Sequence, residues 1–525
     1  MYSTVLYVSL ERPRNAYGTP YVRIDTGVTV QYCTVYTWST HDVKNLSSFF
    51  EFKRLAASQL IPKMIHSSKT EKNIFLLQDV KDSLEGRKKK TFLYLSKDMA
   101  TIRLYYGRDS HEMISRLREA KNGDFEILAL EVRETVLDDC VIEAIVDLLL
   151  HREIKTVQLD DCGAYMNKPA ISMARALGKV KNVRLAETFL SQFFLDSLLM
   201  SATKLEHLRV QDHLDCRQIE ALALGLQKNS SVITLDLSRS RLDSFSILAK
   251  GLKSNSFLKT LKLRSLGLRD QDVNDILESI KDHPTLQVLD LSFNQCQNLQ
   301  SMAKFLDANS TVEELLLGYQ NVWQGPKIDI FELTRALCTN MSLTTLSLAR
   351  NKLCDEDALL LANALLKNSC LQSLDVRENG ISDFGITRLG TSLLHASEQG
   401  SKLKNLNLMK NPFGKTGINA LLSAVRGNMQ LMKLELGNNN DWKLSQEIRY
   451  FTALNRGGRK LLYENPPLAL WPLVLARVNN MDWDKESQCV ASLQRNRSYQ
   501  QDVLCFLMKG PALFEGLVCR SLSSF

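Results

Sequence analysis

Hydrophobic and polar positions follow one short phrase in the middle of the chain and then change to helical spacing. Leucines stand at Leu343, Leu346 and Leu348, and an asparagine closes the phrase at Asn351. The same phrase, L-x-x-L-x-L-x-x-N, returns about 28 residues later, over Leu371–Asn379. Self-similarity at a fixed period of this size is typical of repeats that stack into a solenoid.

Copies of the phrase cover most of the chain. We count about twelve, spaced roughly 25 to 32 residues apart. Their first positions are Phe125, Ile154, Val180, Leu205, Val232, Leu258, Leu286, Val312, Leu343, Leu371, Leu403 and Leu431.

The closing position of the phrase divides the copies. Five copies keep asparagine, at Asn294, Asn351, Asn379, Asn411 and Asn439. Small residues with some hydrogen-bonding capacity substitute in part at Cys162, Thr188 and Ser240. Four others fit poorly, namely Arg133, His213, Leu266 and Gln320. We therefore expect the first half of the repeats to be the less regular half.

The second part of each unit predicts a helix. After Asn351, apolar residues recur at three- and four-residue spacing from Ala358 to Leu366, which places them on one helical face. Asp355 stands where an N-cap is expected. Asn368 follows the helix, where a left-handed residue is usual. The same slot in other units holds Asn229, Asn255, Asn309, Asn340 and Asn428.

Each unit is therefore a strand, a turn, a helix and a tight return. Strand side chains alternate sides, so the paired leucines point inward and the residues between them point outward. One unit cannot bury its apolar face alone, whereas a stack of units buries a continuous core. The pattern predicts parallel strands on the inner side of a curved stack, with helices outside.

These residues resemble those of leucine-rich-repeat proteins, and the unit length is similar to that of the ribonuclease-inhibitor-like subfamily. The resemblance covers about Phe125 to Leu454. It implies an α/β solenoid shaped like a horseshoe, with parallel strands on the concave face and helices on the convex face. It also implies a non-catalytic scaffold that binds a protein partner on the concave face, because this fold hosts many unrelated partners.

The flanks lack the repeat, and we divide the chain into three parts. Residues 1–124 are expected to form a small α+β domain that also caps the first repeat, because solenoid ends need covering. Within it, the alternating stretch around Asp25 and the stretch Phe92–Tyr106 predict strand pairs. Residues 125–455 hold the repeats. Residues 456–525, with an apolar stretch around Trp471, are expected to form a helical C-terminal cap.

Composition excludes few classes of protein. The chain has 525 residues, of which 44% are hydrophobic, as in ordinary soluble proteins. No apolar run is long enough to span a membrane, and the N-terminal sequence is unlike a secretory signal. The eleven cysteines are dispersed, which predicts reduced thiols. We therefore expect a cytoplasmic location, with a nuclear one as the alternative.

The net charge of +8 is uneven along the chain. Residues 1–124 carry about seven more basic than acidic groups, residues 456–525 about three more, and the repeats are slightly acidic. A basic run, Gly86–Lys90, is interpreted as a solvated turn, with a phosphate-binding or localisation patch as the alternative.

The sequence contains no convincing catalytic or cofactor motif. The G-K-T of Phe413–Gly417 lacks the first glycine of a phosphate loop, because that position is Met409. His207, His213 and Cys216 are near one another in sequence, but strand geometry separates the first two, and a metal needs three or four converging ligands. We predict no enzyme activity, no cofactor and no metal.

The concave surface is the candidate site. Residues around the two motif leucines should face the hollow, and stacked strands lie less than about 5 Å apart. Arg184, Arg209, Lys262 and Arg264 would attract an acidic segment of a partner and form ion pairs with it. Tyr319 and Trp323 would be apolar anchors. The complete predicted surface consists of Arg184, His207, Arg209, Asp236, Lys262, Arg264, Phe293, Leu316, Tyr319 and Trp323.

Two other functions remain open at this point. Some proteins with this architecture activate small GTPases, although no motif here transfers that role. The basic N-terminal region could instead bind nucleic acid or acidic lipid, which strong salt dependence would reveal. A span of the membrane is not expected, and nucleic acid is the less favoured partner.

Overall fold

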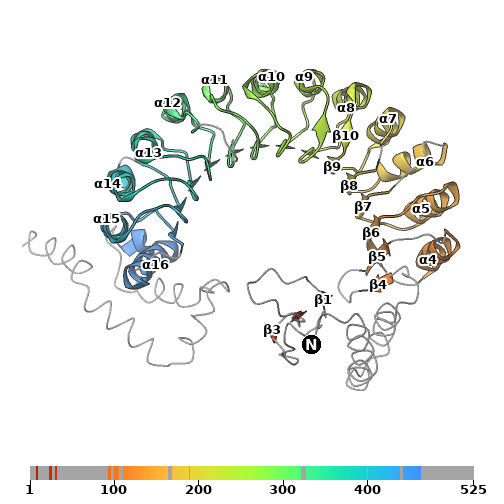
Figure 1. The fold of residues 1–525 in the computed structure, drawn as a ribbon, viewed down its shortest axis with the longest axis horizontal. Coiled ribbons are helices and arrows are strands. Elements are labelled where there is room, and N and C mark those ends of the chain that lie inside the picture. Colours follow the sequence, from red (N-terminus) through yellow and green to blue (C-terminus); the bar gives the residue numbers. More distant parts are fainter. Residues whose placement is uncertain are drawn as a thin grey trace, which may run out of the picture.

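The structure is a computed structural model, and strands line the inner side of an arc while helices line its outer side (Figure 1). This confirms the predicted α/β leucine-rich-repeat solenoid. The residues that the structure describes are 7–9, 23–25, 30–31, 93–95, 100–105, 110–123, 126–162, 168–188, 190–320, 327–398, 400–437 and 442–462.

A 14-stranded sheet runs along the arc. Its strands are β4 (Leu93–Leu95), β5 (Ala100–Tyr105), β6 (Ile127–Arg133), β7 (Thr156–Asp160), β8 (Asn182–Ala186), β9 (His207–Gln211), β11 (Thr234–Asp236), β13 (Thr260–Lys262), β14 (Val288–Asp290), β15 (Glu314–Leu316), β16 (Thr345–Ser347), β17 (Ser373–Asp375), β18 (Asn405–Asn407) and β19 (Lys433–Glu435). Neighbours are parallel except β4 and β5, which pair antiparallel.

Two smaller sheets lie outside this arrangement. β10 (His213–Leu214) and β12 (Arg241–Leu242) form a short parallel pair. β1 (Tyr7–Ser9), β2 (Arg23–Asp25) and β3 (Val30–Gln31) form an antiparallel sheet, which confirms the strands predicted around Asp25.

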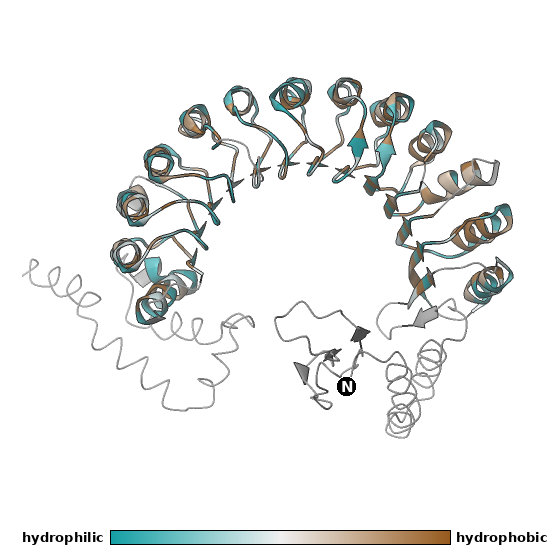
Figure 2. Cartoon of the chain, viewed as in Figure 1, coloured by the Kyte–Doolittle hydropathy of each residue, from teal (hydrophilic) through white to brown (hydrophobic). Residues whose placement is uncertain are grey.

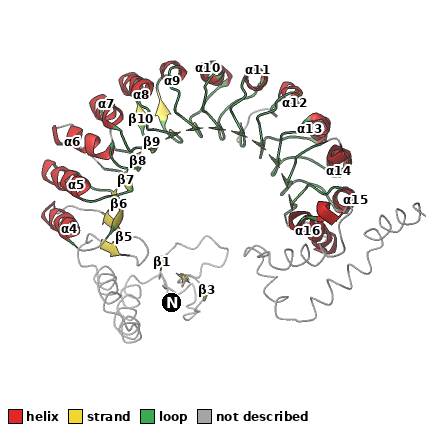
Figure 3. Cartoon of the chain, turned by 180° about the vertical axis from the view of Figure 1, so that it is seen from behind, coloured by secondary structure: helices red, strands yellow, loops and turns green. Residues whose placement is uncertain are grey.

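Helices follow the strands one by one on the outer side of the arc (Figures 1 and 3). They are α4 (Ser110–Asn122), α5 (Asp139–His151), α6 (Lys168–Leu177), α7 (Gln192–Ser201), α8 (Cys216–Lys228), α9 (Phe245–Lys253), α10 (Asp270–Ile280), α11 (Gln300–Ala308), α12 (Phe331–Leu337), α13 (Asp355–Lys367), α14 (Asp383–Glu398), α15 (Lys415–Gly427) and α16 (Trp442–Gly457), followed by the 3₁₀ turn η3 (Arg459–Leu462).

The motif leucines form a continuous core between the sheet and the helices. Leu343, Leu346 and Leu348 are each fully buried, whereas Thr345 and Ser347 between them remain partly exposed. Figure 2 shows hydrophobic residues recurring on the strands and helices along the arc. Burial of apolar area contributes roughly 25 cal/mol per Å², so the stack rather than any one unit supplies the stability.

The closing asparagines tie neighbouring units together. The Asn379 side chain donates to the carbonyl oxygens of Leu348 (3.1 Å) and Val376 (2.9 Å). Its oxygen accepts from the backbone N–H groups of Asn351 (2.8 Å) and Leu353 (3.1 Å) in the preceding unit. Buried backbone groups at this turn would otherwise lack partners, which explains why the motif closes on an amide side chain.

Gln320 performs the same task, and the expectation that it fits poorly was wrong. Its side chain is buried, donates to the carbonyl of Leu291 (2.8 Å) and accepts from the N–H of Cys296 (3.2 Å). Leu266 makes no such bonds, but its own N–H reaches the Asn294 oxygen of the next unit. His213 is exposed and belongs to β10, so the turn there is irregular, as expected.

The helix-end asparagines differ from expectation in their backbone conformation. Asn368 has φ −78° and ψ 122°, which is extended rather than left-handed. Its buried side chain accepts from the N–H groups of Cys370 and Leu371 and donates to the carbonyl of Leu337 in the preceding unit. The side chain, and not a left-handed backbone, therefore makes the return to the strand.

Asp355 is the first residue of α13, and Cys354 is the N-cap, so the predicted N-cap was one residue late. The carboxylate of Asp355 instead accepts from the N–H groups of Ser382 (2.7 Å) and Gly385 (3.1 Å), at the start of the next helix. Its negative charge near the N-terminus of α14 is favourable for the helix dipole.

The arc begins earlier than the first expected copy. In β6 the buried positions are Ile127, Leu130 and Val132, so the phrase predicted from Phe125 lies two residues out of register and Arg133 is not its closing residue. Thr135, which is buried, holds that position. β5 pairs in parallel with β6 and adds a further unit with α4, within residues assigned to the N-terminal part.

Several predictions lie outside the described residues. They include Gly86–Lys90, Trp323, Asn439 and most of the C-terminal cap, including Trp471. The strand pair predicted in Phe92–Tyr106 is confirmed by β4 and β5. Within the described ranges, no helix has the length and apolar character needed to cross a bilayer.

Candidate functional site

Strand pairing arranges the concave side chains in a row. The residues between the two buried motif positions stand opposite one another in register, and we name them the inner row. From β5 to β19 they are Arg103, Glu131, Gln158, Arg184, Arg209, Asp236, Lys262, Asp290, Leu316, Ser347, Asp375, Asn407 and Glu435.

A second row lies where the chain leaves each strand. Its residues adopt positive φ without being glycine, and we name them the rim row: Glu134, Asp161, Glu187, Arg239, Ser265, Phe293, Tyr319, Arg350, Glu378 and Lys410. Such backbone persists only where surrounding structure holds it. For the residues from Glu134 to Glu378, the backbone N–H is bonded to the next unit, as in Tyr319 to the carbonyl of Ala349 at 2.7 Å.

In the first strands the concave charges neutralise one another. Arg103 Nε lies 2.9 Å from Glu131, and Arg133 lies 3.7 Å from Glu131 and 3.3 Å from Asp160. Asp160 also lies 3.1 Å from Arg184. These contacts form one chain of alternating charge across β5 to β8, so little net charge faces a partner there.

The four basic residues predicted for the site, Arg184, Arg209, Lys262 and Arg264, therefore fall into two groups. Arg184 and Arg209 lie on the concave face as expected, but both are paired with carboxylates, Arg209 with Asp236 at 3.6 Å. Lys262 and Arg264 form no ion pair with any residue of the described ranges. His207 lies on the same strand as Arg209, 3.8 Å from Glu206.

Aromatic rings follow the two unpaired cations along the rim. Phe293 and Tyr319, from adjacent units, stack with ring centroids 4.1 Å apart and planes 11° apart. The Arg264 guanidinium lies 4.1 Å from the Phe293 centroid, and that of Arg350 lies 5.1 Å from the Tyr319 centroid. The order of the strands places the arginines on opposite outer faces of the stack, where cation–π attraction is favourable. We name these four residues the rim stack.

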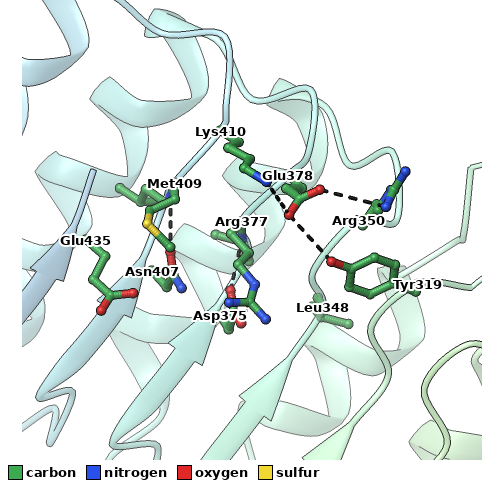
Figure 4. Close-up of polar contacts among 12 residues, drawn as sticks. Tyr319, Leu348, Arg350, Asp375, Arg377, Glu378, Asn407, Met409, Lys410 and Glu435 are labelled. Carbon is green, nitrogen blue, oxygen red and sulfur yellow. Dashed lines mark hydrogen bonds and ion pairs between the residues drawn. The ribbon is translucent and has the colours of Figure 1, made fainter. Parts of the chain in front are cut away.

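Beyond the rim stack, Glu378 gathers three partners (Figure 4). Lys410 Nζ lies 3.0 Å from its carboxylate, Arg350 lies 3.9 Å away, and the Tyr319 hydroxyl donates to it at 3.5 Å. The hydrogen bond from Lys410 holds the pKa of Glu378 below its usual range, and the nearby arginines add to this effect. The carboxylate therefore stays charged at neutral pH and fixes the tyrosine and Arg350.

The floor beside the rim stack is lined by small side chains. Leu316 of the inner row is partly exposed, whereas Gly318 is buried, and a Cβ at that glycine would lie 3.4 to 3.6 Å from Ala349 and Ser347. The backbone bonds that join the units place Ser292 and Ala349 on either side of Gly318. Ser292 and Ala349 are also buried, so Leu316 is the side chain of this floor that a partner can contact.

Asp375 marks the far side of this floor (Figure 4). Burial raises the pKa of its carboxyl, while the N–H of Arg377 (3.1 Å) and the Arg377 guanidinium (3.3 Å) partly offset that effect. The Asp375 carboxylate is therefore already paired with Arg377, two residues further along the chain.

Most predicted site residues lie on the concave side, as the motif register requires, whereas Trp323 lies outside the described residues. The sequence reasoning missed Arg350, Glu378 and Lys410. They occupy the position just before the closing asparagine, the same position as Phe293 and Tyr319. Comparing that single motif position across all units would have found them.

The other candidate motifs have structural roles. Gly414 and Gly417, from the G-K-T stretch, both donate backbone N–H groups to the Asp383 carboxylate, at 2.8 and 2.7 Å. That carboxylate occupies the place a phosphate would need. His213 pairs with Asp243 at 3.0 Å. No group of three potential metal ligands occurs among the residues described, and the cysteines there are free thiols.

Comparisons with known proteins agree with this repeat structure. The family model described as "Leucine Rich repeat" matches residues 339–362 and 367–390. The ribonuclease inhibitor of Mus musculus is 28% identical over 288 residues, which are 52% of this chain and 61% of the inhibitor. This chain is built from leucine-rich repeats and is similar in sequence to the ribonuclease inhibitor.

Two further similarities are to part of a curated protein and to one solved structure. The NACHT, LRR and PYD domains-containing protein 14 of Mus musculus is 30% identical over 220 residues, covering 40% of this chain and 21% of that protein. The crystal structure of the Rad7 and Elc1 complex in yeast is 15% identical with a TM-score of 0.40, covering 78% of this chain and 96% of that chain. The chain thus spans less than two thirds of the first curated relatives it matches.

Proposed function

We propose that this leucine-rich-repeat protein is a non-catalytic scaffold that binds a protein partner on its concave face, at the strands from β13 to β18. Proteins built from such repeats generally present extended concave surfaces to other proteins. The observation that carries the proposal is the rim stack, because partly exposed Tyr and Arg side chains on a rigid scaffold are typical of interface hot spots.

The charges favour an acidic surface of the partner. Lys262 and Arg264 lack carboxylate partners among the described residues, while Arg184 and Arg209 are already paired. An arginine that lies flat on a ring keeps its N–H edge available, and that edge matches a carboxylate in two places. The binding region is therefore narrower than the predicted one, and its cations lie at the centre of the arc.

The rim stack argues for protein over nucleic acid at this surface. A nucleobase binds by stacking on an open ring face. Both outer ring faces of Phe293 and Tyr319 are covered by guanidinium groups, and the inner faces cover each other. Only ring edges and arginine edges are open, which suits side chains of a protein.

The test compares capture from a native lysate by three proteins of equal stability. The first is the wild type, and the second carries Arg264→Glu and Tyr319→Ala. The third carries Phe384→Ala and Arg388→Glu on the convex helix α14, where a similar exposed arginine lies 5.2 Å from a ring centroid. We expect partners that the wild type and the convex variant retain and the concave variant loses. Equal partner sets on all three would contradict the proposal.

A further inference from the structure

The rim stack has a length that constrains what can bind along it. Its successive separations, 4.1, 4.1 and 5.1 Å, place the two guanidinium carbons roughly 13 Å apart at most. Three strand spacings of about 4.8 Å give a similar distance between β13 and β16. An extended chain rises about 3.3 Å per residue, so this span corresponds to four residues.

The periodicity of an extended chain then fixes which partner side chains face the protein. Residues i, i+2 and i+4 point to the same side of such a chain. If residue i meets Arg264, residue i+4 reaches Arg350, and residue i+2 lies over the edges of Phe293 and Tyr319. Leu316 is partly exposed on the inner row of the same unit as Tyr319, so this central side chain can also contact it.

Charge and polarity set the residue types. Arg264 has no carboxylate partner among the described residues, and Arg350 has only the 3.9 Å contact with Glu378, whose carboxylate lies closer to Lys410. Both guanidinium groups can therefore donate two N–H groups to a further carboxylate. The ring edges and Leu316 suit an apolar side chain between these carboxylates.

We propose that the rim stack recognises an extended segment of the partner with the pattern acidic-x-apolar-x-acidic. This inference rests on the proposed function, because it specifies the chemistry of the partner at the same surface. It requires Arg264 and Arg350 as the two carboxylate sites, and it predicts that the spacing of the acids matters as much as their number.

The test uses two labelled peptides of identical composition and fluorescence anisotropy with the full chain. The matched peptide is Gly-Ser-Glu-Thr-Leu-Thr-Glu-Ser-Gly, and the shifted peptide is Gly-Ser-Glu-Thr-Leu-Glu-Thr-Ser-Gly, in which the second acid points to the other side. We expect the matched peptide to bind at least about tenfold more tightly, because only it presents both acids to the arginines.

Variants assign the two carboxylate sites. Arg264→Gln and Arg350→Gln should each abolish the preference for the matched peptide, and Arg264→Lys should keep only part of it, because lysine cannot form a forked contact. Arg388→Gln on the convex face is the matched control and should leave the preference unchanged. Thermal unfolding of each variant confirms that it is folded.

The outcomes separate this inference from the function on which it rests. Equal binding of the two peptides, or no binding of either, overturns the proposed pattern. If the lysate experiment still shows partners lost only by the concave variant, the scaffold function stands without this pattern. If the concave variant retains every partner, the proposed function itself fails.

Discussion

From β5 to β8, the concave charges of this protein neutralise one another, whereas from β13 to β16 cations meet aromatic rings. The chain of contacts from Arg103 to Arg184 alternates in sign at 2.9 to 3.7 Å. The four residues of the rim stack include no carboxylate, and Glu378 lies beyond its end, 3.9 Å from Arg350. The same repeat thus supplies one closed surface and one open surface, and the open one is the better candidate for recognition.

The two regions also differ in the turns beneath these surfaces. The earlier units close on Thr135, Cys162, Thr188 and Ser240, whereas the units from β14 to β18 use buried Asn or Gln side chains that bridge units. A binding surface needs side chains held in place by a rigid support. Apart from the unit of β13, which closes on Leu266, the open surface therefore lies on the part of the arc where closing side chains bridge the units.

The largest expected effect tests this difference in the turns. Asn379→Ala should lower the free energy of unfolding by about 2–4 kcal/mol, because it leaves buried N–H groups of Asn351 and Leu353 without acceptors. Thr188→Val should be nearly neutral, because the buried Thr188 hydroxyl has no hydrogen-bond partner in the structure. Urea unfolding of both variants measures the contrast. Equal losses would show that the two kinds of turn contribute alike.

The second prediction compares the two surfaces in binding. Tyr319→Ala should weaken capture of a concave-face partner by about 2 kcal/mol, roughly 30-fold, as expected for an aromatic hot spot. Glu131→Gln, which breaks the closed chain of charges at Arg103, should leave affinity within about twofold. Surface plasmon resonance with a partner identified by capture would measure both. A comparable loss for Glu131→Gln would extend the binding surface into the first strands.

Salt should distinguish the surfaces further. Because the open surface uses unpaired cations, raising the salt concentration from about 0.05 to 0.5 M should weaken partner binding roughly tenfold, mainly through a slower association rate. Arg264→Gln should reduce this salt dependence, whereas Arg184→Gln should leave it nearly unchanged, because Arg184 is already neutralised by Asp160. Stopped-flow kinetics at several salt concentrations gives the slopes, and equal slopes in all three proteins would contradict the assignment.

The smallest expected effect concerns the two carboxylates at the far end of the open surface. The pKa of Glu378 is lowered in the folded protein, mainly by Lys410, so its charge stabilises the fold at neutral pH, and this contribution disappears as pH falls through that lowered pKa. The pKa of Asp375 is raised by burial, so its charge is unfavourable at neutral pH, and protonation relieves this as pH falls through the raised pKa.

Glu378→Gln should therefore destabilise the protein at pH 7, whereas Asp375→Asn should not. For each variant the change in the free energy of unfolding should be less than about 1 kcal/mol, because both groups are partly exposed. The difference between the variants should vanish only when the pH has fallen below the lowered pKa of Glu378. Chemical unfolding at several pH values measures it. A difference that persists in acid would show that packing rather than charge separates the two variants.

The sequence alone determined the repeat, the curvature and the sides of the strands, because the apolar period is written in residues such as Leu343, Leu346 and Leu348. It also placed Arg264, Phe293 and Tyr319 on the concave side. It misjudged Gln320, because a poor match to a motif letter can still make the same hydrogen bonds. It also gave the wrong register for the first copy. Phe125, Leu128 and Leu130 fit the phrase, but the buried positions are Ile127, Leu130 and Val132, each two residues later.

Only the tertiary structure decided which charges are free. Arg184 and Lys262 are both basic and occupy the same motif position, yet Arg184 meets Asp160 whereas Lys262 forms no ion pair within the described residues. That outcome depends on the neighbouring unit, about 25 to 30 residues away along the chain. A motif fixes the direction of each side chain, whereas pairing across stacked strands fixes its partner. Recognition by this protein therefore depends on contacts between units that no single repeat contains.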